Sequence, residues 1–485
     1  MNLNFGLLAP ELALAISAVV LILADLFTQK KGALPVIALL GIIVSGILAV
    51  SQTGEGRGFN GMLLSDNFAI FFKILFLAAA GIVVLSSIDY VMKLRRLHGE
   101  YYALLLFATL GLMFMASTGE LISIYISLEL ASLSLYALAG LLKDPKSSEA
   151  SLKYLLLGAM ASAVLLYGMA LIFGLTGKTQ LGDIAVSLKQ IGFAGLADRP
   201  ALIAGLAMLA GGFGFKIATV PFQMWVPDVY EGAPTPVTAF LSVASKAAGF
   251  AVIIRVFSII FGWSVEMSSN WGFLFAVLSA LSMTAGNVIA ISQSNIKRMM
   301  GYSSIAQAGY LMVGLAAIGF AGPRESPGIS SVLFFLASYT ATNLAAFIAI
   351  IAISNRINSD QIVDYTGMMK RSPLLAVCLA LAMVSLIGIP PTAGFIAKVY
   401  VFNTAVQQGL AWLVVIGVVN SVISAYYYLR IVKVMFLGAA ATEEKVASTP
   451  SLSFALALTS LAVLFVGVFP IFLLEIARNA IKIIS

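Results

Sequence analysis

The sequence is poor in charge and has almost none of the side chains that bind metals. Only 10% of its 485 residues are charged, against roughly 25% in soluble proteins. This scarcity excludes a soluble enzyme, an intrinsically disordered chain and a nucleic-acid-binding protein. The single cysteine, Cys378, permits no disulfide within the chain, and the single histidine, His98, lies in a basic segment. These counts argue against haem, zinc and iron–sulfur sites, so any redox chemistry that the protein serves takes place elsewhere.

Hydrophobic residues make up 61% of the chain, and its mean hydropathy is +1.03. A helix crosses a bilayer with about 20 apolar residues, which predicts an all-α polytopic membrane protein of about fourteen transmembrane helices. The predicted spans are 6–27, 33–51, 67–92, 101–118, 119–141, 149–175, 200–221, 235–260, 271–291, 302–320, 331–353, 373–402, 409–430 and 453–475.

Basic residues are distributed unevenly between the two ends of these spans. Fifteen follow odd-numbered spans: Lys30, Lys31, Lys93, Arg95, Arg96, Lys143, Lys146, Lys297, Arg298, Arg356, Lys370, Arg371, Arg430, Lys433 and Lys445. Seven lie at the opposite ends: Arg57, Lys178, Lys189, Arg199, Arg324, Arg478 and Lys482. Because cytoplasmic loops are enriched in Lys and Arg, we expect the first loop to be cytoplasmic and both termini to lie outside.

Two charged side chains lie near the middle of predicted spans. A charge at the bilayer centre costs at least about 2.5–3.5 kcal/mol on insertion scales. Glu129 is too short to reach the interface and shares a polar helix face with Ser132. Lys246 lies on nearly the same face as Ser242. We interpret both charges as parts of a proton path; the alternative for Glu129 is a structural, hydrogen-bonded carboxylate.

Two further lysines lie beside prolines that interrupt their spans. Pro221 removes a backbone donor and clashes with the preceding turn, so the seventh helix should break just after Lys216. Pro390 and Pro391 should break the twelfth helix ahead of Lys398, which frees the carbonyls four residues before each proline. Broken helices at membrane depth occur where they line a cavity or are buried in protein. Both lysines are therefore predicted to be functional.

Three other basic residues lie closer to the ends of their spans. Lys153 is about one turn into the sixth span, and we assign it to the proton path; its alternative is a side chain that reaches the interface. Lys73 and Arg255 are interpreted as side chains of this second kind. We therefore expect Lys73→Ala to have little effect.

Polar uncharged residues continue this line in the later spans. Ser303, Gln307 and Tyr310 share a face of the tenth span, and Tyr339 and Asn343 share a face of the eleventh. With water they could bridge the buried lysines; the alternative is ordinary hydrogen bonding between helices. Burial and repulsion between like charges disfavour the protonated form of a lysine, whereas a nearby carboxylate favours it. The approach or withdrawal of a carboxylate can therefore decide whether each amine binds or releases a proton. The pattern predicts a proton relay.

The two broken helices occupy matching places in two sets of five spans. The seventh helix is fourth in the set 4–8, and the twelfth is fourth in the set 9–13. Because five is odd, the two sets run in opposite directions, as in the inverted repeats of many transporters. The single membrane domain, 1–485, is accordingly divided into 1–100, a first repeat at 101–260, a second repeat at 271–430 and a last helix at 453–475.

Several stretches of the sequence resemble the antiporter-like membrane subunits of respiratory complex I, the proton-translocating NADH–quinone oxidoreductase. The likeness is carried by residues 212–236 (GFGFKIATVPFQMWVPDVYEGAPTP), 245–246, 294–304 and 388–398, which are spread over most of the chain. Lysines at both 246 and 398 are typical of one of three sister subunits. The other two usually carry histidine in place of Lys246, and one of them carries glutamate in place of Lys398.

The resemblance implies a subunit of an enzyme complex that has no redox centre or metal of its own. FMN and iron–sulfur clusters are expected in partner subunits, with NADH and quinone as substrates of the complex. The expected partners are the lipid bilayer and neighbouring membrane-arm subunits, without nucleic acid, in a bacterial cytoplasmic (inner) membrane. The resemblance further implies that Glu129 pairs with or releases Lys153 or Lys216, and that the proton then passes Lys246 toward Lys398.

Three other functions remain open on the residues alone. A subunit of a multisubunit sodium/proton antiporter could share the buried lysines and would work without NADH. A structural membrane-arm subunit would use its charges only to hold neighbours together. A stand-alone transporter for a small solute is the third alternative.

Overall fold

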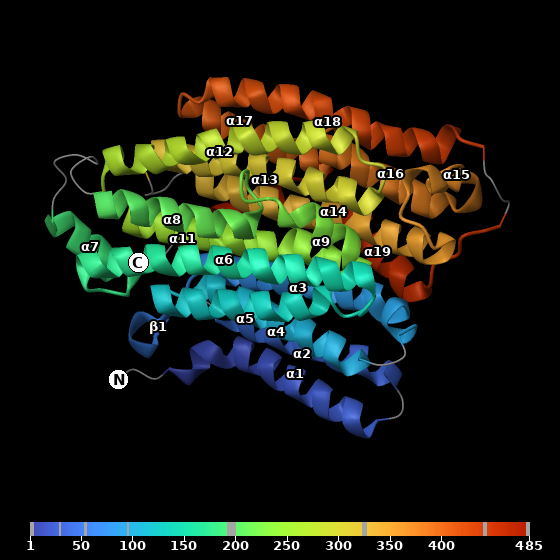
Figure 1. Cartoon of the computed structure of the whole chain (residues 1–485), viewed down its shortest axis with the longest axis horizontal. Helices are drawn as coiled ribbons and strands as arrows, with labels where there is room; N and C mark the ends of the chain where they lie inside the picture. Colours follow the sequence, from blue (N-terminus) through green and yellow to red (C-terminus); the bar gives the residue numbers. More distant parts are fainter. Residues whose placement is uncertain are drawn as a thin grey trace.

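The computed structural model describes residues 4–28, 31–52, 56–94, 97–191, 200–322, 327–439 and 444–481. Six basic residues used above to orient the chain lie outside these ranges: Lys30, Arg95, Arg96, Arg199, Arg324 and Lys482. Long helices run side by side in a bundle that extends from α1 (Ala9–Phe27) at one edge to α18 (Ala411–Leu437) at the other (Figure 1).

The remaining long helices follow the predicted spans closely. They are α2 (Leu34–Ser51), α3 (Asn67–Met92), α4 (His98–Ser117), α5 (Leu121–Ala139), α6 (Pro145–Thr176), α8 (Pro200–Ile217), α11 (Lys246–Ile260), α12 (Val265–Ile291), α13 (Ile296–Ala321), α14 (Pro327–Ile357), α16 (Pro373–Ile387), α17 (Ala393–Gln407) and α19 (Pro450–Val468). Shorter helices are η1 (Phe5–Leu8), η2 (Lys31–Ala33), η3 (Phe59–Gly61), α7 (Leu181–Ile191), α9 (Trp225–Gly232), α10 (Thr235–Phe240), η5 (Leu241–Ser245), η6 (Ile362–Tyr365), α15 (Met368–Arg371) and α20 (Ile471–Asn479).

In the described part of the chain, thirteen helical segments are long and apolar enough to cross a membrane. The remaining predicted span, 373–402, consists of the two 15-residue helices α16 and α17. The expected fold class, a polytopic all-α membrane protein, is therefore confirmed, and a two-stranded hairpin is its only described strand structure.

Both predicted helix breaks are present. The seventh span stops at Ile217, and α9 begins only at Trp225 after the turn that contains Pro221. The twelfth span stops at Ile387, where Gly388 takes the left-handed conformation (φ 90°) that commonly ends a helix. Because a proline offers no backbone N–H to the preceding turn, each break leaves carbonyl groups without helical partners.

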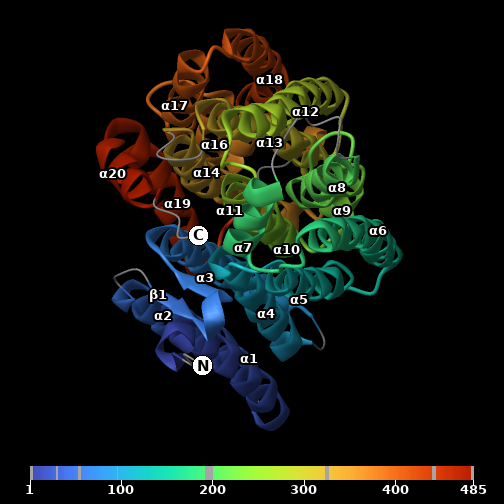
Figure 2. The same ribbon diagram turned by 90° about the vertical axis from the view of Figure 1, so that its left-hand side faces the viewer.

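The structure adds elements that the sequence analysis did not predict. An antiparallel hairpin pairs β1 (Gly56–Gly58) with β2 (Leu63–Ser65), and the amphipathic helix α7 lies near it at the same end of the bundle (Figure 2). The prediction for the last span, 453–475, was too long. Helix α19 ends at Val468 because Pro470 cannot continue it, and α20 follows as a separate helix.

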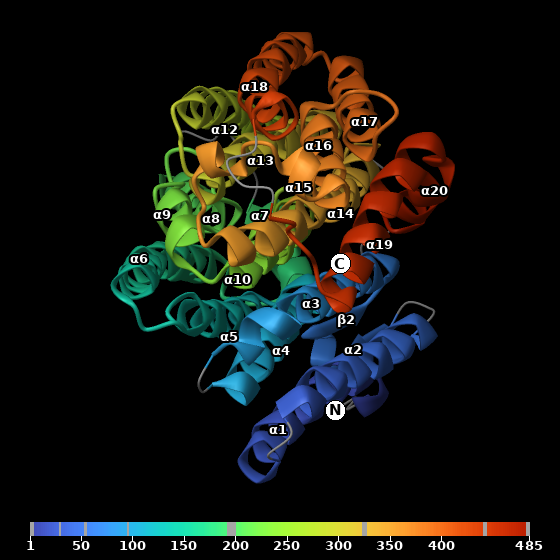
Figure 3. The same cartoon turned by 90° about the vertical axis from the view of Figure 1, so that its right-hand side faces the viewer.

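Segments near the start and near the end of the chain lie at the same end of the bundle (Figure 1). The side-chain amide of Gln52, after α2, donates to the carbonyl of Gly6 at 2.9 Å. At the start of α3, the Asn67 amide donates to the carbonyl of Asn479 at 3.2 Å. The opposite end, which carries α9 and α15, is called the α9 end below (Figure 3).

Helices α13 and α14, together with the span 235–260, form the centre of the bundle and are buried on nearly all sides. The outer helices, such as α1, α6 and α18, instead expose rows of large apolar side chains. A helix that is apolar all round is typical of a protein core within the membrane. The centre is therefore the part of the fold in which a buried charge is most completely enclosed by protein.

Candidate functional site

Three lysines of the predicted relay lie inside the bundle. Lys216, Lys246 and Lys398 expose only 4%, 2% and 5% of their surface. They occupy the last turn of α8, the first turn of α11 and the first half of α17. Among the described residues, no carboxylate oxygen lies within 4.0 Å of any of the three amines. All three are held by neutral groups.

Lys216 faces the polar stripe of α5. Its Nζ donates to the Oγ of Ser132 at 3.0 Å. Glu129, one turn earlier on α5, is partly buried, and its carboxylate accepts a hydrogen bond from the hydroxyl of Ser162 on α6. Ser132, Ser162 and Lys216 line one small cavity, together with Tyr136, that has room for about one water molecule. Ser162 thus links Glu129 to the cavity that holds the Lys216 amine.

Lys246 directly follows the π-helical turn η5 inside the span 235–260. Such turns inside α-helices are frequent at functional sites. The Nζ of Lys246 donates to the backbone carbonyl of Ser304 on α13 and, at 3.1 Å, to its Oγ. It also lies 5.9 Å from the ring centroid of Tyr339 on α14. The hydroxyl of Ser304 in turn donates to the Tyr230 hydroxyl on α9 at 3.2 Å.

Lys398 caps the broken end of α16. Its Nζ donates to the carbonyls of Leu386 and Ile387 at 3.0 and 2.9 Å, and to the Oγ of Ser421 on α18 at 2.9 Å. The amine also lies 4.3 Å from the ring centroid of Tyr310, a cation–π distance. The two carbonyls that the prolines free are therefore the ones that bind this lysine.

Two of the five predicted polar residues, Gln307 and Tyr339, lie between Lys246 and Lys398, and a third, Tyr310, lies against the Lys398 amine. Tyr339, which faces Lys246, also lines a second small cavity together with Gln307 and Lys398. This cavity likewise has room for about one water molecule. The Gln307 amide donates at 3.1 Å to the carbonyl of Leu386, the same oxygen that Lys398 uses. Tyr339, Gln307 and the second cavity thus lie between the two amines, and the Tyr339 hydroxyl has no hydrogen-bond partner among the described residues.

The other two predicted polar residues contact neighbouring helices. The Asn343 amide donates to the Oγ of Ser242 at 2.6 Å, one turn before Lys246. Ser303 is hydrogen-bonded to the hydroxyl of Tyr428 on α18. Neither contact reaches an amine of the relay.

Sequence reasoning missed three polar residues that hold the amines or their partners. Ser304 and Ser421 accept hydrogen bonds from Lys246 and Lys398. Asn287 on α12 donates to the Tyr310 hydroxyl at 3.2 Å and accepts from Tyr427 at 2.9 Å. The sequence feature that could have identified these three residues is that each is a polar residue inside an apolar span.

Lys153 lies apart from the buried amines. Its side chain is 43% exposed at the α9 end, where its Nζ contacts Glu149 at 2.7 Å and Asp228 at 2.8 Å. The resemblance implies that Glu129 pairs with or releases Lys153 or Lys216. In the structure neither amine lies within 4.0 Å of the Glu129 carboxylate, which is bound by Ser162, and the carboxylate partners of Lys153 are Glu149 and Asp228.

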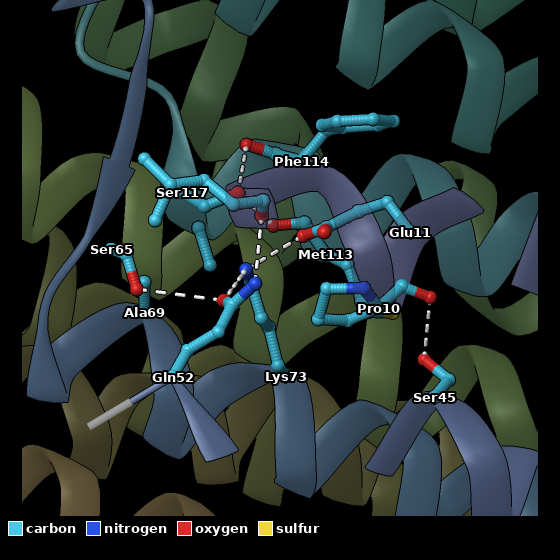
Figure 4. A network of polar contacts seen from close by, with 12 residues as sticks. Pro10, Glu11, Ser45, Gln52, Ser65, Ala69, Lys73, Met113, Phe114 and Ser117 are labelled. Atoms are coloured by element: carbon cyan, nitrogen blue, oxygen red, sulfur yellow. Dashed lines mark hydrogen bonds and ion pairs between the residues drawn. The ribbon is translucent and has the colours of Figure 1, made fainter. Parts of the chain in front are cut away.

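The interpretation of Lys73 and Arg255 as side chains that reach the interface is wrong. Lys73 is completely buried and forms a 2.8 Å ion pair with Glu11 of α1, beside Gln52 (Figure 4). Arg255 is also completely buried and binds both carboxylate oxygens of Asp66 at 2.9 Å. Both cations remain inside the protein because each has a carboxylate partner from a neighbouring helix, a contact that spacing along the chain does not reveal.

Comparisons with known proteins agree on one family. Residues 118–424 match the family model described as NADH:quinone oxidoreductase/Mrp antiporter, TM. The chain is 46% identical over 482 residues to NADH-quinone oxidoreductase subunit N of Dehalococcoides mccartyi, covering 99% of both chains. It is similar to a chain of respiratory complex I from Thermus thermophilus, with 32% identity, a TM-score of 0.80 and coverage of 97% and 99%. A chain of the Mrp complex from Dietzia shares the fold, with 20% identity, a TM-score of 0.83 and coverage of 99% and 97%.

Proposed function

This chain belongs to the family of NADH-quinone oxidoreductase subunit N, and on that premise we propose that it moves protons through Glu129, Lys216, Lys246 and Lys398. NADH oxidation and quinone reduction take place in partner subunits, which hold the FMN and the iron–sulfur clusters. The chain contributes to the membrane arm beside related subunits. Its own residues bind, hold and release protons inside the bilayer.

The observation that carries this proposal is the contrast between two kinds of buried cation. Lys73 and Arg255 are each buried beside a carboxylate that balances the charge of the cation. Lys216, Lys246 and Lys398 are buried with only hydroxyl, carbonyl and ring partners among the described residues. An ammonium without a counter-charge is costly in a membrane interior and is a mark of a functional site, so these three amines are the candidates for carrying a mobile proton.

The geometry supports an order for the relay. The Lys216 amine lines the first cavity, to which Ser162 links the Glu129 carboxylate, and Tyr339 and the second cavity lie between Lys246 and Lys398. A change that brings the Glu129 carboxylate nearer to the Lys216 amine stabilises its protonated form; withdrawal releases the proton. Moving one charge against a potential of order 150 mV costs about 3.5 kcal/mol. A change of a few pKa units, at about 1.36 kcal/mol each, is large enough to drive that step.

We further propose that the chain spans a bacterial cytoplasmic membrane with the α9 end on the cytoplasmic side. The support is the excess of Lys and Arg in the loops at that end. We also propose that residues 101–260 and 271–430 are inverted repeats. Each half contains a broken fourth span with a buried lysine beside the break.

The test measures NADH-driven proton pumping and quinone reduction by the assembled complex in vesicles. Lys216→Met and Lys246→Met should each lower pumping at least tenfold while the complex still assembles. Lys370→Met, at an exposed position of α15, is the control and should leave pumping unchanged. Normal pumping by an assembled complex that carries Lys246→Met would refute the relay. Loss of assembly with normal pumping by the remainder would favour a structural subunit, and sodium-dependent transport without NADH would favour an antiporter.

A further inference from the structure

Helix α9 connects the surface of the bundle to its buried lysines. It is only eight residues long and fills the interval between the break after Lys216 and the span that carries Lys246. Its neighbours are α6 on one side and α13 on the other (Figure 3). Gly301 of α13 packs so closely against α9 that a Cβ added there would lie 3.3 Å from the Cα of Pro227. Helix α9 is therefore closely packed against α13 around Pro227.

The exposed side of α9 carries a carboxylate shared by two cations. Asp228 contacts the Nζ of Lys153 on α6 at 2.8 Å and the guanidinium of Arg298 on α13 at 2.6 Å. Burial tends to raise the pKa of Asp228, but the hydrogen bonds from Lys153 and Arg298 outweigh it and bring this pKa below its ordinary value. Single surface ion pairs contribute little, whereas this carboxylate joins three helices at one point.

The buried side of α9 contacts the groups around the two relay lysines. The Tyr230 hydroxyl accepts a hydrogen bond from Ser304, the residue that binds the Lys246 amine. At the start of the helix, the Trp225 indole donates at 3.1 Å to the carbonyl of Phe215, the residue before Lys216. The short helix thus touches the immediate surroundings of both amines.

Two of these contacts join the same pair of helices. Arg298 and Ser304 both belong to α13, and they bind Asp228 and Tyr230 of α9. The outer contact is ionic and partly exposed, and the inner one is neutral and buried. Because Asp228 and Tyr230 lie two positions apart on α9, a shift of this helix at the outer contact also changes the separation at the inner one.

From this arrangement we propose that Asp228 is a positioning residue for Lys246. Bound by Lys153 and Arg298, it forms a clamp that holds α9 against α13, so that the Tyr230 hydroxyl keeps accepting the hydrogen bond of the Ser304 hydroxyl while the Ser304 Oγ accepts from the Lys246 amine. Loss of this clamp lets α9 move away from α13 and removes the acceptor that orients the Ser304 hydroxyl toward the protonated amine. The proposal rests on the relay function proposed above, and it assigns Lys153 to the clamp rather than to the relay.

Among the described residues, few charged groups face Asp228 or Lys246. Around Asp228 they are Lys153 and Glu149 on α6, Arg298 on α13, and Glu231, which contacts Arg298 at 3.2 Å. Around Lys246 the titratable neighbours are Tyr339 and, through Ser304, Tyr230. A change at Asp228 therefore reaches Lys246 through packing and Ser304 rather than through another charge.

The experiment compares carboxylate substitutions in the assembled complex. Asp228→Asn should shift the pH profile of NADH-driven pumping by about one unit, which is a tenfold change in proton affinity. Glu149→Gln is the matched control, because Glu149 contacts Lys153 at a similar distance but lies outside α9, and it should leave the profile unchanged. Asp228→Glu should restore most of the wild-type profile.

Tyr230→Phe provides a second test that does not disturb the surface cluster. It removes the hydroxyl that Ser304 contacts and should shift the profile in the same direction, without adding to the shift of Asp228→Asn. An unshifted profile in both variants, with Lys246→Met inactive, would overturn the clamp and leave the relay standing. If Lys246→Met also pumped normally, the relay itself would fail. If the complex that carries Asp228→Asn does not assemble, Lys153→Met takes its place. Its pH profile is then compared with that of Tyr230→Phe, and the same outcomes test the clamp.

Discussion

The buried ion pair between Glu11 and Lys73 leads to a quantitative prediction that differs from the expectation based on sequence. Both side chains are inaccessible to solvent, and 2.8 Å separates Nζ from Oε1. Lys73→Met leaves the Glu11 carboxylate buried without its cation. Removal of one partner of a buried pair costs about 3–5 kcal/mol. Lys73→Met and Lys73→Ala should therefore be strongly destabilising rather than silent.

The double variant Lys73→Met, Glu11→Gln should recover most of that loss. Replacing a buried pair by neutral groups of similar size is often close to neutral, because the cost of burying the charges disappears with them. A double-mutant cycle should consequently give a coupling of about 3 kcal/mol between the two positions. The coupling is obtained from the thermal unfolding of the complex in detergent, measured for each member of the cycle. The abundance of each complex in membranes is compared with this measurement.

The pair formed by Lys31 and Asp25 is the matched control. It has nearly the same length, 2.7 Å, but the two side chains are 31% and 18% exposed. Exposed pairs contribute about 0.2–1 kcal/mol, so Lys31→Met should have a small effect. If Lys73→Met costs no more than Lys31→Met, burial does not determine the strength of these pairs and the reasoning is wrong. Normal pumping per assembled complex in the double variant would also place the pair outside the relay.

Three further outcomes follow from the backbone and the charges. Gly394→Ala should prevent correct packing of α17 on α16, because its Cβ would lie 1.9 Å from the Ser385 carbonyl oxygen; the abundance of the assembled complex measures this. Gly174→Ala, in open space on α6, should be neutral or stabilising by up to about 1 kcal/mol in the same assay. The pKa of the Asp228 carboxyl lies below the ordinary carboxyl pKa of about 3.9. The ion pairs of Asp228 should therefore contribute fully to stability above about pH 3.9, and this contribution should be lost as the pH falls through the lowered pKa. The difference in melting temperature between wild type and Asp228→Asn should accordingly be constant from pH 6 to 8 and shrink only in acid.

Much of the fold was predictable because the bilayer imposes simple constraints on a chain. Long apolar runs could only be helices, and prolines at 221, 390 and 391 could only interrupt them. The boundary between the fourth and fifth spans was also predicted, since a short polar turn lies at 117–120. The hairpin at 56–65 escaped notice because its strands have only three residues each, too few for an alternating pattern.

The partners of the buried charges could not be predicted from spacing. Asp66 and Arg255 are 189 positions apart, so only the packing of α3 against α11 brings them together. The positions of Lys73 and Arg255 near the ends of their spans suggested contact with the interface, but neighbouring parts of the protein cover both side chains. Lys153 is the opposite case. It was assigned to the proton path inside the bilayer, but although it lies two turns into α6, its carboxylate partners lie at the exposed α9 end. Periodicity indicates which face a residue occupies, not what covers that face.

The two broken spans show that similar sequence features serve different purposes. At the second break, Lys398 itself binds the carbonyls that the prolines free, so the break and the amine form one unit. At the first break, the Phe215 carbonyl is taken by Trp225, and the Oγ of Ser282 on α12 accepts from the Val220 N–H. Lys216 is left to bind Ser132 on α5 instead. Because the first lysine is independent of its break, it is free to respond to Glu129, whereas the second is held in place by the backbone that it caps.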